Sequence, residues 1–462
     1  MPKEALRRDL SFVQALALNM IDMVGIGPFV VLPLVIGIMG GPQHIVAWVT
    51  GAGLALVDGC VWAELGAAMP RAGGSYVFLR EAFGPRWGRP VAFLFIWQTM
   101  LQAPLVVASG AIGFAQYLSY LVPLTAVTRR VASGTLVLAL TFLLYRKIAT
   151  LGKITLFLWA GVLGILAWFI LGGLSHFDPK LAFSYPPGAW DFRWAFWMAL
   201  GHANILTTYA YLGYYNVTHL GGEIRSPEKN IPRAIFVSIL GIAAIYLAMQ
   251  FAVIGVIPWR EAQASPFIVS TLIERLYGPV ASALATVLVL WIAFASLFAV
   301  MLGYSRIPYA AALDGNFFPA MGRLHPTKGF PHLALLWLGG TAFVFSLLFT
   351  LTQVIYAILA MRILVQFIGG AMGVMLLRNR PGGGNPPFKM WLYPLPALMA
   401  ILLWTSILAA TGWRFALAGL GMTVLGAGVY LVLHGFPRRG RDGSPSPGNR
   451  PDSAPKAPFQ AP

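Results

Sequence analysis

The sequence predicts an all-α polytopic membrane protein, and three observations carry this prediction. Of the 462 residues, 58% are hydrophobic and only 10% are charged, whereas roughly 25% of the residues in a soluble protein are charged. The mean hydropathy is +0.74. The apolar residues form long continuous runs, unlike the alternating ten-residue strands of a membrane barrel. A disulfide scaffold is also excluded, because Cys60 is the only cysteine.

Twelve stretches of the chain are long and apolar enough to cross a bilayer as a helix, which takes about 20 residues. We therefore expect 12 transmembrane helices. They run over residues 11–38, 44–69, 90–121, 131–146, 150–174, 193–220, 233–257, 278–304, 332–351, 354–378, 391–410 and 414–434. We expect residues 1–10 to form a cytoplasmic N-terminal tail. Residues 435–462 are rich in proline, glycine and serine and predict a disordered cytoplasmic tail.

The basic residues predict the orientation of the helices. With the N-terminus in the cytoplasm, the inside segments carry 24 Lys and Arg and the outside loops carry 7, as the positive-inside rule requires. We therefore expect a multi-pass protein of the plasma (inner) membrane with both termini cytoplasmic. Topology and contact with anionic lipid then explain the net charge of +17, and no nucleic-acid partner is needed.

Helix-breaking residues lie near the middle of the first and sixth predicted spans. Gly25 and Gly27 stand with Pro28 in the first span, and Gly213 stands in the sixth. Unwound backbone at membrane depth is tolerated only inside the protein or beside a water-filled cavity. Breaks in the first helix of each of two five-helix halves are typical of a transporter site. The alternative is glycine that only packs, since glycine is common in membrane helices.

Five segments then indicate a family. They read GIGPF at 25–29, PRAGGSY at 70–76, YAYLG at 209–213, GEIRSPEKNIPRA at 222–234, and SRIPY at 305–309 with Asp314-Gly315 behind it. In this order and on these sides of the membrane, they resemble the amino acid–polyamine–organocation (APC) superfamily of secondary transporters. The resemblance covers nearly everything except the C-terminal tail.

The resemblance implies an arrangement of the helices within a transporter domain of residues 11–434. Residues 11–174 and 193–378 would form two inverted five-helix repeats, each beginning with a broken helix. Residues 391–434 would form two peripheral helices. Transport would proceed by alternating access, through rocking and gating of the helices around a site near the membrane midplane.

The resemblance also assigns residues to the substrate, because half-helix ends present unpaired backbone groups. The first break would bind an amino acid carboxylate and the second its ammonium group, and Gly213 belongs to the second break. Two departures weaken carboxylate recognition: Ile26 stands where the family has a serine, and Pro28 has no N–H. The substrate-binding residues that we expect are Gly25, Ile26 and Gly27 in the first break and Tyr209, Ala210, Tyr211 and Gly213 in the second.

Several ionisable residues lie inside the predicted spans, where each is a functional hypothesis. Asp22, one turn before the first break, is expected to face the substrate, to bind a cationic group or take up a proton, or else to cap the helix. No family motif includes Asp58, so we expect either a functional acid or a neutral packing acid bonded to a neighbouring helix. Lys153 resembles a lysine that replaces sodium in some relatives, which favours proton coupling or exchange, or it extends to the cytoplasmic surface. Arg362 is expected to pair with an acid, line the outer vestibule or extend to the surface.

Further residues are expected to gate the path. Tyr209 matches the family's aromatic gate above the substrate. Arg71, Tyr76 and Glu223, together with Glu64 near the cytoplasmic end of the second span, are expected to form or adjoin an inside gate closed by ion pairs. The alternative is a set of solvated cytoplasmic loops.

These features favour a secondary active transporter of amino acids, coupled to protons or working as an exchanger rather than coupled to sodium. A polyamine or other organocation permease is the alternative substrate class, favoured by Asp22 and by the hydroxyl missing at Ile26. A non-transporting amino-acid sensor is the alternative of another class. An enzyme is not expected, since the seven histidines show no metal-ligand spacing and no phosphate-binding loop occurs. We expect no cofactor and no metal.

Overall fold

The computed structural model describes residues 8, 10–71, 73–145, 151–380 and 385–435, and it leaves out the side chains of residues 151–158. Most of the two predicted tails therefore lies outside the described residues. Within the described residues the chain is helical, and the one extended contact is an isolated parallel bridge between Leu10 and Ile224.

The first half of the chain forms long helices that coincide with the predicted spans 1 to 5. They are α1 (Phe12–Met23), α2 (Gly27–Met39), α3 (Ile45–Ala68), α5 (Gly84–Leu121), α6 (Ala126–Leu144) and α7 (Leu151–Ser175). The short elements η1 (Pro42–His44), α4 (Ser75–Ala82) and α8 (Pro179–Ala182) lie between or after them.

The second half follows with helices at the predicted spans 6 to 12. They are α9 (Trp194–Tyr211), α10 (Pro227–Ile254), α12 (Ile268–Tyr304), α14 (His332–Leu348), α15 (Leu351–Arg362), the π-helix η5 (Ile363–Ile368), α16 (Gly369–Arg378), α17 (Leu395–Ala410) and α18 (Trp413–His434). The short elements are η3 (Asn216–His219), α11 (Trp259–Ala262), α13 (Arg306–Leu313) and η4 (Pro319–Gly322).

Length and composition support a multi-pass membrane protein. Seven helices of the described residues are long and apolar enough to cross a membrane, and the bent pair α1 and α2 makes an eighth. Three shorter apolar helices lie at Trp159–Ser175, His332–Leu348 and Leu395–Ala410. The total of 12 spans and the inverted repeat stay predictions.

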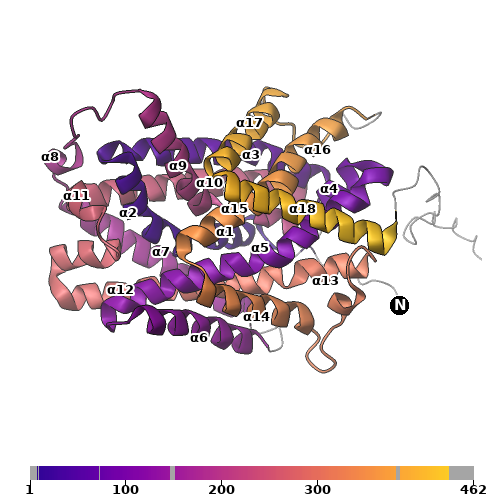
Figure 1. Cartoon of the computed structure of the whole chain (residues 1–462), viewed down its shortest axis with the longest axis horizontal. Coiled ribbons are helices and arrows are strands. Elements are labelled where there is room, and N and C mark those ends of the chain that lie inside the picture. The colour runs from indigo at the N-terminus through magenta and orange to yellow at the C-terminus, as the bar shows by residue number, and fades with distance from the viewer. Residues whose placement is uncertain (1–7, 9, 72, 146–150, 381–384, 436–462) are drawn as a thin grey trace, which may run out of the picture.

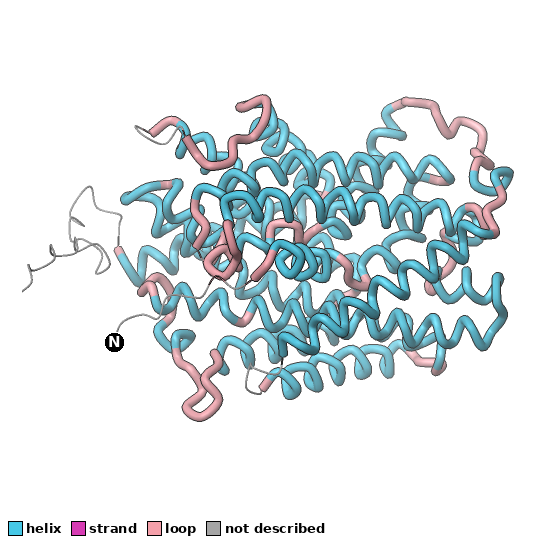
Figure 2. The backbone as a smooth tube through the Cα atoms, turned by 180° about the vertical axis from the view of Figure 1, so that it is seen from behind, coloured by secondary structure: helices cyan, strands magenta, loops and turns pink. Residues whose placement is uncertain are grey.

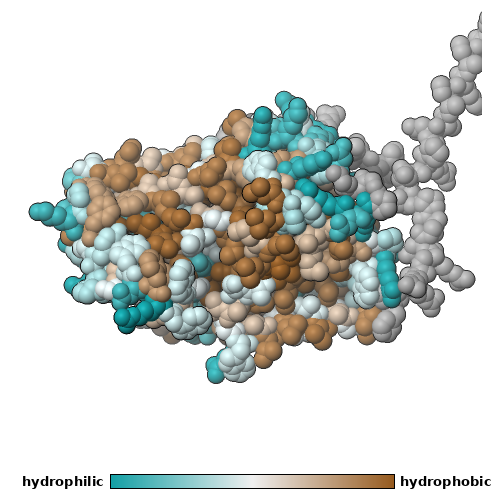
Figure 3. Space-filling model, turned by 90° about the horizontal axis from the view of Figure 1, so that it is seen from above, coloured by the Kyte–Doolittle hydropathy of each residue, from teal (hydrophilic) through white to brown (hydrophobic). Residues whose placement is uncertain are grey.

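The long helices run roughly along one axis of the molecule (Figures 1 and 2). Seen from above, hydrophobic residues cover the middle of the surface, and hydrophilic residues gather toward the two ends of that axis (Figure 3). The short helices α4 and α13 lie at one end, and α8 and α11 lie at the other (Figure 1). This separation agrees with the predicted alternation of the loops, while the side that faces the cytoplasm stays a prediction.

Both predicted helix breaks are present. α1 ends at Met23 and α2 begins at Gly27, with a bend of 48° between them. Pro28 lies in the first turn of α2, where its missing N–H costs no helical hydrogen bond. α9 ends at Tyr211, and an irregular segment containing Gly213 leads into the short η3. Glycine and proline thus interrupt the helix where the sequence indicates.

Packing brings the two breaks together. α1 packs against α10, α2 against α9, and the long α5 contacts α12, α14 and α15. α17 contacts α3, α9 and η5. α18 is largely exposed, with 17% of its most apolar 18 residues buried; its peripheral role stays a prediction.

Candidate functional site

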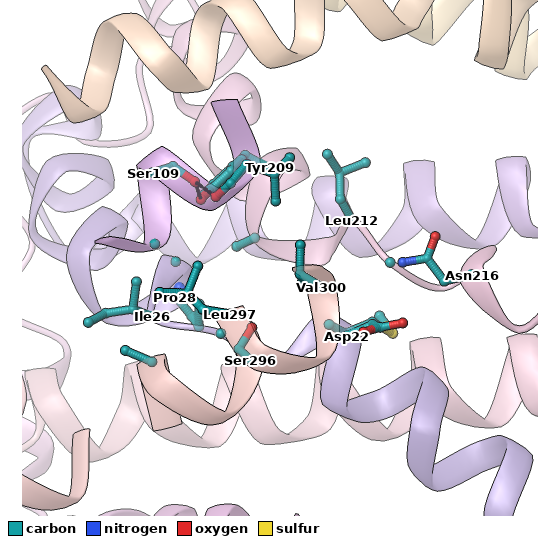
Figure 4. A pocket seen from close by; sticks show the side chains of 18 of the residues that line it. Asp22, Ile26, Pro28, Ser109, Tyr209, Leu212, Asn216, Ser296, Leu297 and Val300 are labelled. Atoms are coloured by element: carbon teal, nitrogen blue, oxygen red, sulfur yellow. Dashed lines mark hydrogen bonds between the residues drawn. The ribbon is translucent and has the colours of Figure 1, made fainter. Parts of the chain in front are cut away.

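A cavity lies where the two helix breaks meet. Its lining comes from both breaks, from α5 and α12, and from the end of α15, and it encloses about 680 Å³ of empty space including its open mouth. In Figure 4, Ser109 and Tyr209 lie near one end of the cavity with Ile26 and Pro28 below them, while Asp22 and Asn216 lie at the other end.

Most of the predicted binding residues line this one cavity. The lining includes the predicted residues Asp22, Gly25, Ile26, Gly27, Tyr209, Ala210, Gly213 and Arg362. Tyr211 does not line it, because its ring packs away from the cavity. The Tyr211 ring centroid lies 6.0 Å from that of Trp48 and 5.3 Å from that of Tyr246.

The start of α2 presents unpaired backbone donors. Among the described residues, the N–H groups of Gly25, Ile26 and Gly27 have no hydrogen-bond acceptor, whereas those of Phe29 and Val30 both donate to the carbonyl oxygen of Ile26. Free N–H groups at a helix N-terminus carry a partial positive charge. This break can therefore bind an anionic group such as a carboxylate.

The end of α9 presents backbone acceptors. The carbonyl oxygens of Tyr211 and Leu212 receive no hydrogen bond from any described residue. The carbonyl oxygen of Tyr209 receives only a long bond of 3.3 Å from the N–H of Leu212. Carbonyl oxygens at a helix C-terminus carry a partial negative charge. This break can bind a cationic group such as an ammonium.

Two polar side chains connect the breaks. The hydroxyl of Tyr246 on α10 lies 2.9 Å from the carbonyl oxygen of Met23 and 3.3 Å from that of Ala210. Asn19 on α1 donates from Nδ2 to the carbonyl oxygen of Tyr214 at 2.9 Å and accepts at Oδ1 from the N–H of Val217 at 3.0 Å. Both irregular segments are therefore held in one arrangement.

Tyr209 closes one side of the cavity. Its hydroxyl lies 2.8 Å from the hydroxyl of Ser109 on α5. Its ring also lies against the start of α2, because a Cβ atom at Gly27 would be 3.0 Å from Tyr209 Cε1. A side chain at Gly27 would displace the ring. The gate role expected for Tyr209 stays a prediction.

Asp22 and Arg362 both line the cavity without forming an ion pair with each other. The Asn216 amide lies beside the carboxyl group of Asp22, and no described ion pair includes Asp22. Arg362 is 5% exposed. It donates hydrogen bonds to the hydroxyls of Tyr215 and Tyr304. Arg362 therefore neither reaches the surface nor pairs with an acid in the described part of the chain.

The predicted gate residues form no ion pair with one another in the described part of the chain. The loops of Arg71 and Glu223 are nevertheless in contact, because a Cβ atom at Gly221 would lie 3.2 Å from the carbonyl oxygen of Arg71. Glu64 forms a bidentate ion pair with Arg378, whose Nε and Nη2 each lie 2.6 Å from a carboxylate oxygen. The Glu64 carboxylate also accepts a hydrogen bond of 2.8 Å from the N–H of Met390. Glu223 pairs through its backbone with Leu10. Arg71 is exposed, and no ion pair between described residues includes it or Glu223.

Tyr76 lies on α4, between the predicted spans. Its hydroxyl is buried near the side chains of Asn316 and Arg80, and the guanidinium of Arg80 lies 5.8 Å from its ring centroid. Burial, with the nearby charge of Asp314, raises the pKa of Tyr76. Burial opposes the charge on Arg80, but Asp314 at 2.7 Å and Glu81 outweigh it and raise the pKa of Arg80. The ion pair of Arg80 thus joins α4 to the segment after α13.

The role predicted for Lys153 rests on a side chain that lies outside the described residues; its backbone belongs to α7. Asp58 has the hydrogen bonds that its packing role requires. Its carboxylate accepts from Trp62 at 2.6 Å, Tyr214 at 2.7 Å and Trp404 at 2.9 Å. α3, α17 and the segment after α9 meet at this one carboxylate.

Sequence reasoning missed several lining residues. Ser109, Ser296 and Tyr304 lie on the long helices α5 and α12, where no break or motif distinguishes them. Asn216 is different, since it follows the second break by three residues and its position alone could have indicated a role. Ser296 is the close neighbour of the first break, because a Cβ atom at Gly25 would lie 2.9 Å from Ser296 Oγ.

A multi-pass helical protein with a cavity between two helix breaks has the architecture of a membrane transporter. The chain matches the amino acid permease family over residues 10–429 and belongs to that family. This membership confirms the resemblance to the APC superfamily and the prediction that the protein is a transporter and not an enzyme.

Individual relatives are distant but cover most of the chain. The serine/threonine exchanger SteT of Bacillus subtilis is 26% identical over 404 residues, 86% of this chain and 89% of that protein. The human Asc-type amino acid transporter 1 is 27% identical over 460 residues, 94% of this chain and 82% of that protein. The human large neutral amino acids transporter small subunit 2 is 24% identical over 458 residues, which cover 93% of this chain and 81% of that protein.

Proposed function

We propose that this protein is a secondary active transporter that carries amino acids through the described cavity by alternating access. One observation carries the proposal: two unwound backbone segments of opposite polarity line one cavity. Free N–H groups at Gly25, Ile26 and Gly27 suit a carboxylate, and the free carbonyl oxygen of Leu212 suits an ammonium. An α-amino acid carries both groups on one carbon.

Alternating access requires that the cavity open to each side in turn. The Tyr209–Ser109 hydroxyl pair supports a gate on one side, because it is a single hydrogen bond between α9 and α5. We propose that the ion pair of Glu64 with Arg378, or the loops that contain Arg71, Tyr76 and Glu223, close the other side. The relatives named exchangers or transporters of amino acids support the substrate class.

We propose that Asp22 carries a coupled proton or sets exchange, and that the protein does not use sodium. The position of Asp22 in the cavity, beside Asn216 and without a cationic partner, supports this role. Asp22→Asn should then change substrate affinity, preference or the pH dependence of uptake. Unchanged values for all three would refute the role. For Lys153, normal transport by Lys153→Ala without any sodium dependence would refute the cation-surrogate role.

The proposal includes a location and a division of the chain. The protein lies in the plasma (inner) membrane in contact with lipid and has both termini in the cytoplasm. It is built from two five-helix repeats, 11–174 and 193–378, with 391–434 peripheral. The bias of lysine and arginine toward one set of loops supports the orientation. Reporter fusions after residues 124 and 435 test it, since the proposal requires opposite sides of the membrane.

The first test is thermal stabilisation of the purified full chain in detergent. The ligands are the 20 amino acids beside putrescine, spermidine and agmatine. A ligand present at 100 times its Kd adds about 2.7 kcal/mol to the free energy of unfolding, which raises the melting temperature measurably. Stabilisation by α-amino acids, reduced in Gly25→Val, supports the proposed function.

Two other results would change the conclusion. Stabilisation by polyamines alone would make the protein an organocation permease, which the carboxyl group of Asp22 and the absence of a hydroxyl at Ile26 favour. Binding of amino acids without counterflow in proteoliposomes would make it a sensor. Failure of every ligand in the panel would contradict the proposed function.

A further inference from the structure

Arg362 is a buried cation with no anionic partner in the described part of the chain. Its residue is 5% exposed, and no Asp or Glu in the described ranges lies within 4.0 Å of its nitrogens. Its partners are two neutral phenols, Tyr215 and Tyr304. Its Nε has no acceptor among the described residues. Buried charges are normally paired, so this guanidinium retains a strong capacity to bind an anion.

The surroundings hold the guanidinium in place. It lies 5.4 Å from the ring centroid of Tyr215 and 5.7 Å from that of Tyr304, so two aromatic rings and two hydroxyls fix it. The helix changes to a π-helix immediately after it, over Ile363–Ile368, and π-helical turns are frequent at functional sites. Arg362 is among the residues that line the cavity, so a bound substrate would lie beside this fixed cation.

Arg362 lies away from the break that suits the α-carboxylate. On α12, Ser296 adjoins Gly25, and Tyr304, which bonds to Arg362, follows eight residues later, roughly 12 Å along the helix. On the other side Arg362 bonds to Tyr215, the neighbour of Asn216. Arg362 therefore belongs to the Asp22 and Asn216 end of the cavity. For an amino acid bound at the two breaks to reach Arg362, its side chain has to lie toward this end.

The permanent charge at this end is positive. Arginine keeps its proton at any physiological pH, whereas a carboxyl group such as that of Asp22 can become neutral by taking up a proton. Asp22 also has a neutral neighbour, the amide of Asn216. A guanidinium binds a carboxylate through two parallel hydrogen bonds, and such bidentate pairs are among the strongest hydrogen-bonded contacts that arginine makes.

We propose that Arg362 binds the side-chain carboxylate of the substrate, so that the protein selects acidic amino acids, glutamate or aspartate. This inference rests on the proposed function, since it requires an amino acid held at the helix breaks. It assigns Arg362 to substrate specificity, because the residue contacts the substrate side chain and not the groups common to all amino acids.

The experiment measures thermal stabilisation of the purified full chain by L-glutamate, L-aspartate, L-glutamine, L-asparagine and L-leucine, with competition for uptake in proteoliposomes. In the wild type we expect glutamate to bind at least about tenfold more tightly than glutamine, since charge-assisted pairs are roughly twice as strong as neutral ones. In Arg362→Gln this preference should disappear or reverse. Arg362→Lys, which keeps the charge, should retain a smaller preference.

Arg414→Gln is the matched control, since Arg414 is an exposed arginine at the start of α18; it should keep the wild-type preference. If Arg362→Gln does not fold, the ligand preference of the wild type and the smaller preference expected in Arg362→Lys still test the inference. Tighter binding of glutamine or leucine than of glutamate by the wild type would overturn the inference, as would an unchanged ratio in Arg362→Gln. Binding of neutral amino acids only would leave the proposed function intact, whereas binding of no amino acid would contradict both.

Discussion

Gly213 packs directly against the backbone of Asp22. A Cβ atom at Gly213 would lie 3.1 Å from the carbonyl carbon and oxygen of Asp22, closer than ordinary van der Waals contact. The φ angle of Gly213 is +121°, which other residues rarely adopt. The contact joins the second helix break to the last turn before the first. The cavity therefore depends on glycine at this position.

Gly213→Ala should damage the site. The new methyl group meets the Asp22 backbone and the positive φ is strained, so we expect a stability loss of roughly 1–3 kcal/mol and a loss of ligand-induced stabilisation. Gly53→Ala on α3 is the control, because a Cβ atom there meets nothing within 4 Å. Melting curves and ligand titrations of both variants test the prediction. Equal behaviour of the two variants would contradict it.

Tyr246→Phe should loosen the connection between the breaks. The variant keeps the ring contact with Trp48, whose centroid lies 5.5 Å away, and loses the hydroxyl that contacts the carbonyl oxygens of Met23 and Ala210. We expect a loss of about 1 kcal/mol of stability and weaker substrate binding. Differential scanning fluorimetry with and without ligand measures both. Tyr185→Phe, in an exposed loop, is the control for the loss of a phenol hydroxyl. If Tyr246→Phe binds substrate as tightly as this control does, the Tyr246 hydroxyl does not connect the two breaks.

The hydroxyl pair of Tyr209 and Ser109 should set the rate of opening on its side of the cavity. Tyr209→Phe keeps the ring over Gly27 but removes the hydrogen bond, and Ser109→Ala removes the other partner. A net hydrogen bond is worth about 0.5–1.5 kcal/mol, so each variant should exchange substrate roughly 2–10 times faster. The double variant should exchange no faster than either single variant, because one bond is lost in all three. Additive effects in exchange assays would mean that the two hydroxyls act separately.

The ion pair of Glu64 with Arg378 should couple strongly. Their side chains are 4% and 16% exposed, so Glu64→Gln or Arg378→Met leaves a buried charge alone. The expected cost is roughly 3–5 kcal/mol for each single variant and less for the pair replaced together. Chemical denaturation of the three variants measures the coupling. The control is Asp191→Asn, which breaks the ion pair with Arg193; the side chain of Arg193 is 85% exposed and that of Asp191 is 59% exposed. This variant should have no measurable effect on stability. Strictly additive losses for Glu64→Gln and Arg378→Met would contradict the prediction.

The sequence predicted much of the fold for local reasons. Long apolar runs predicted the helices, since a helix that crosses a bilayer needs about 20 mostly apolar residues. Gly25, Gly27 and Pro28 predicted the first break, and Gly213 the second, because these residues disfavour helix whatever surrounds them. The same glycine and proline residues predicted which residues of the two breaks line the cavity.

The partners of the charged residues could not be predicted, because packing between distant segments decides them. Glu64 finds Arg378 at a separation of 314 residues, and Asp58 finds Trp404 at 346. Tyr211 turns to Trp48 while Tyr209, two residues earlier, lines the cavity. A helix places residues two apart on different faces, but only the assembled bundle shows which face meets the cavity.

Counterflow in proteoliposomes tests the central claim most directly. Vesicles that contain the full chain and are loaded with an unlabelled amino acid from the stabilising set are diluted into the same amino acid carrying a radiolabel. The account predicts saturable accumulation of label, strongly reduced in Gly213→Ala and unchanged in Gly53→Ala. Uptake no greater than in protein-free vesicles, or equal in both variants, would contradict transport through this cavity.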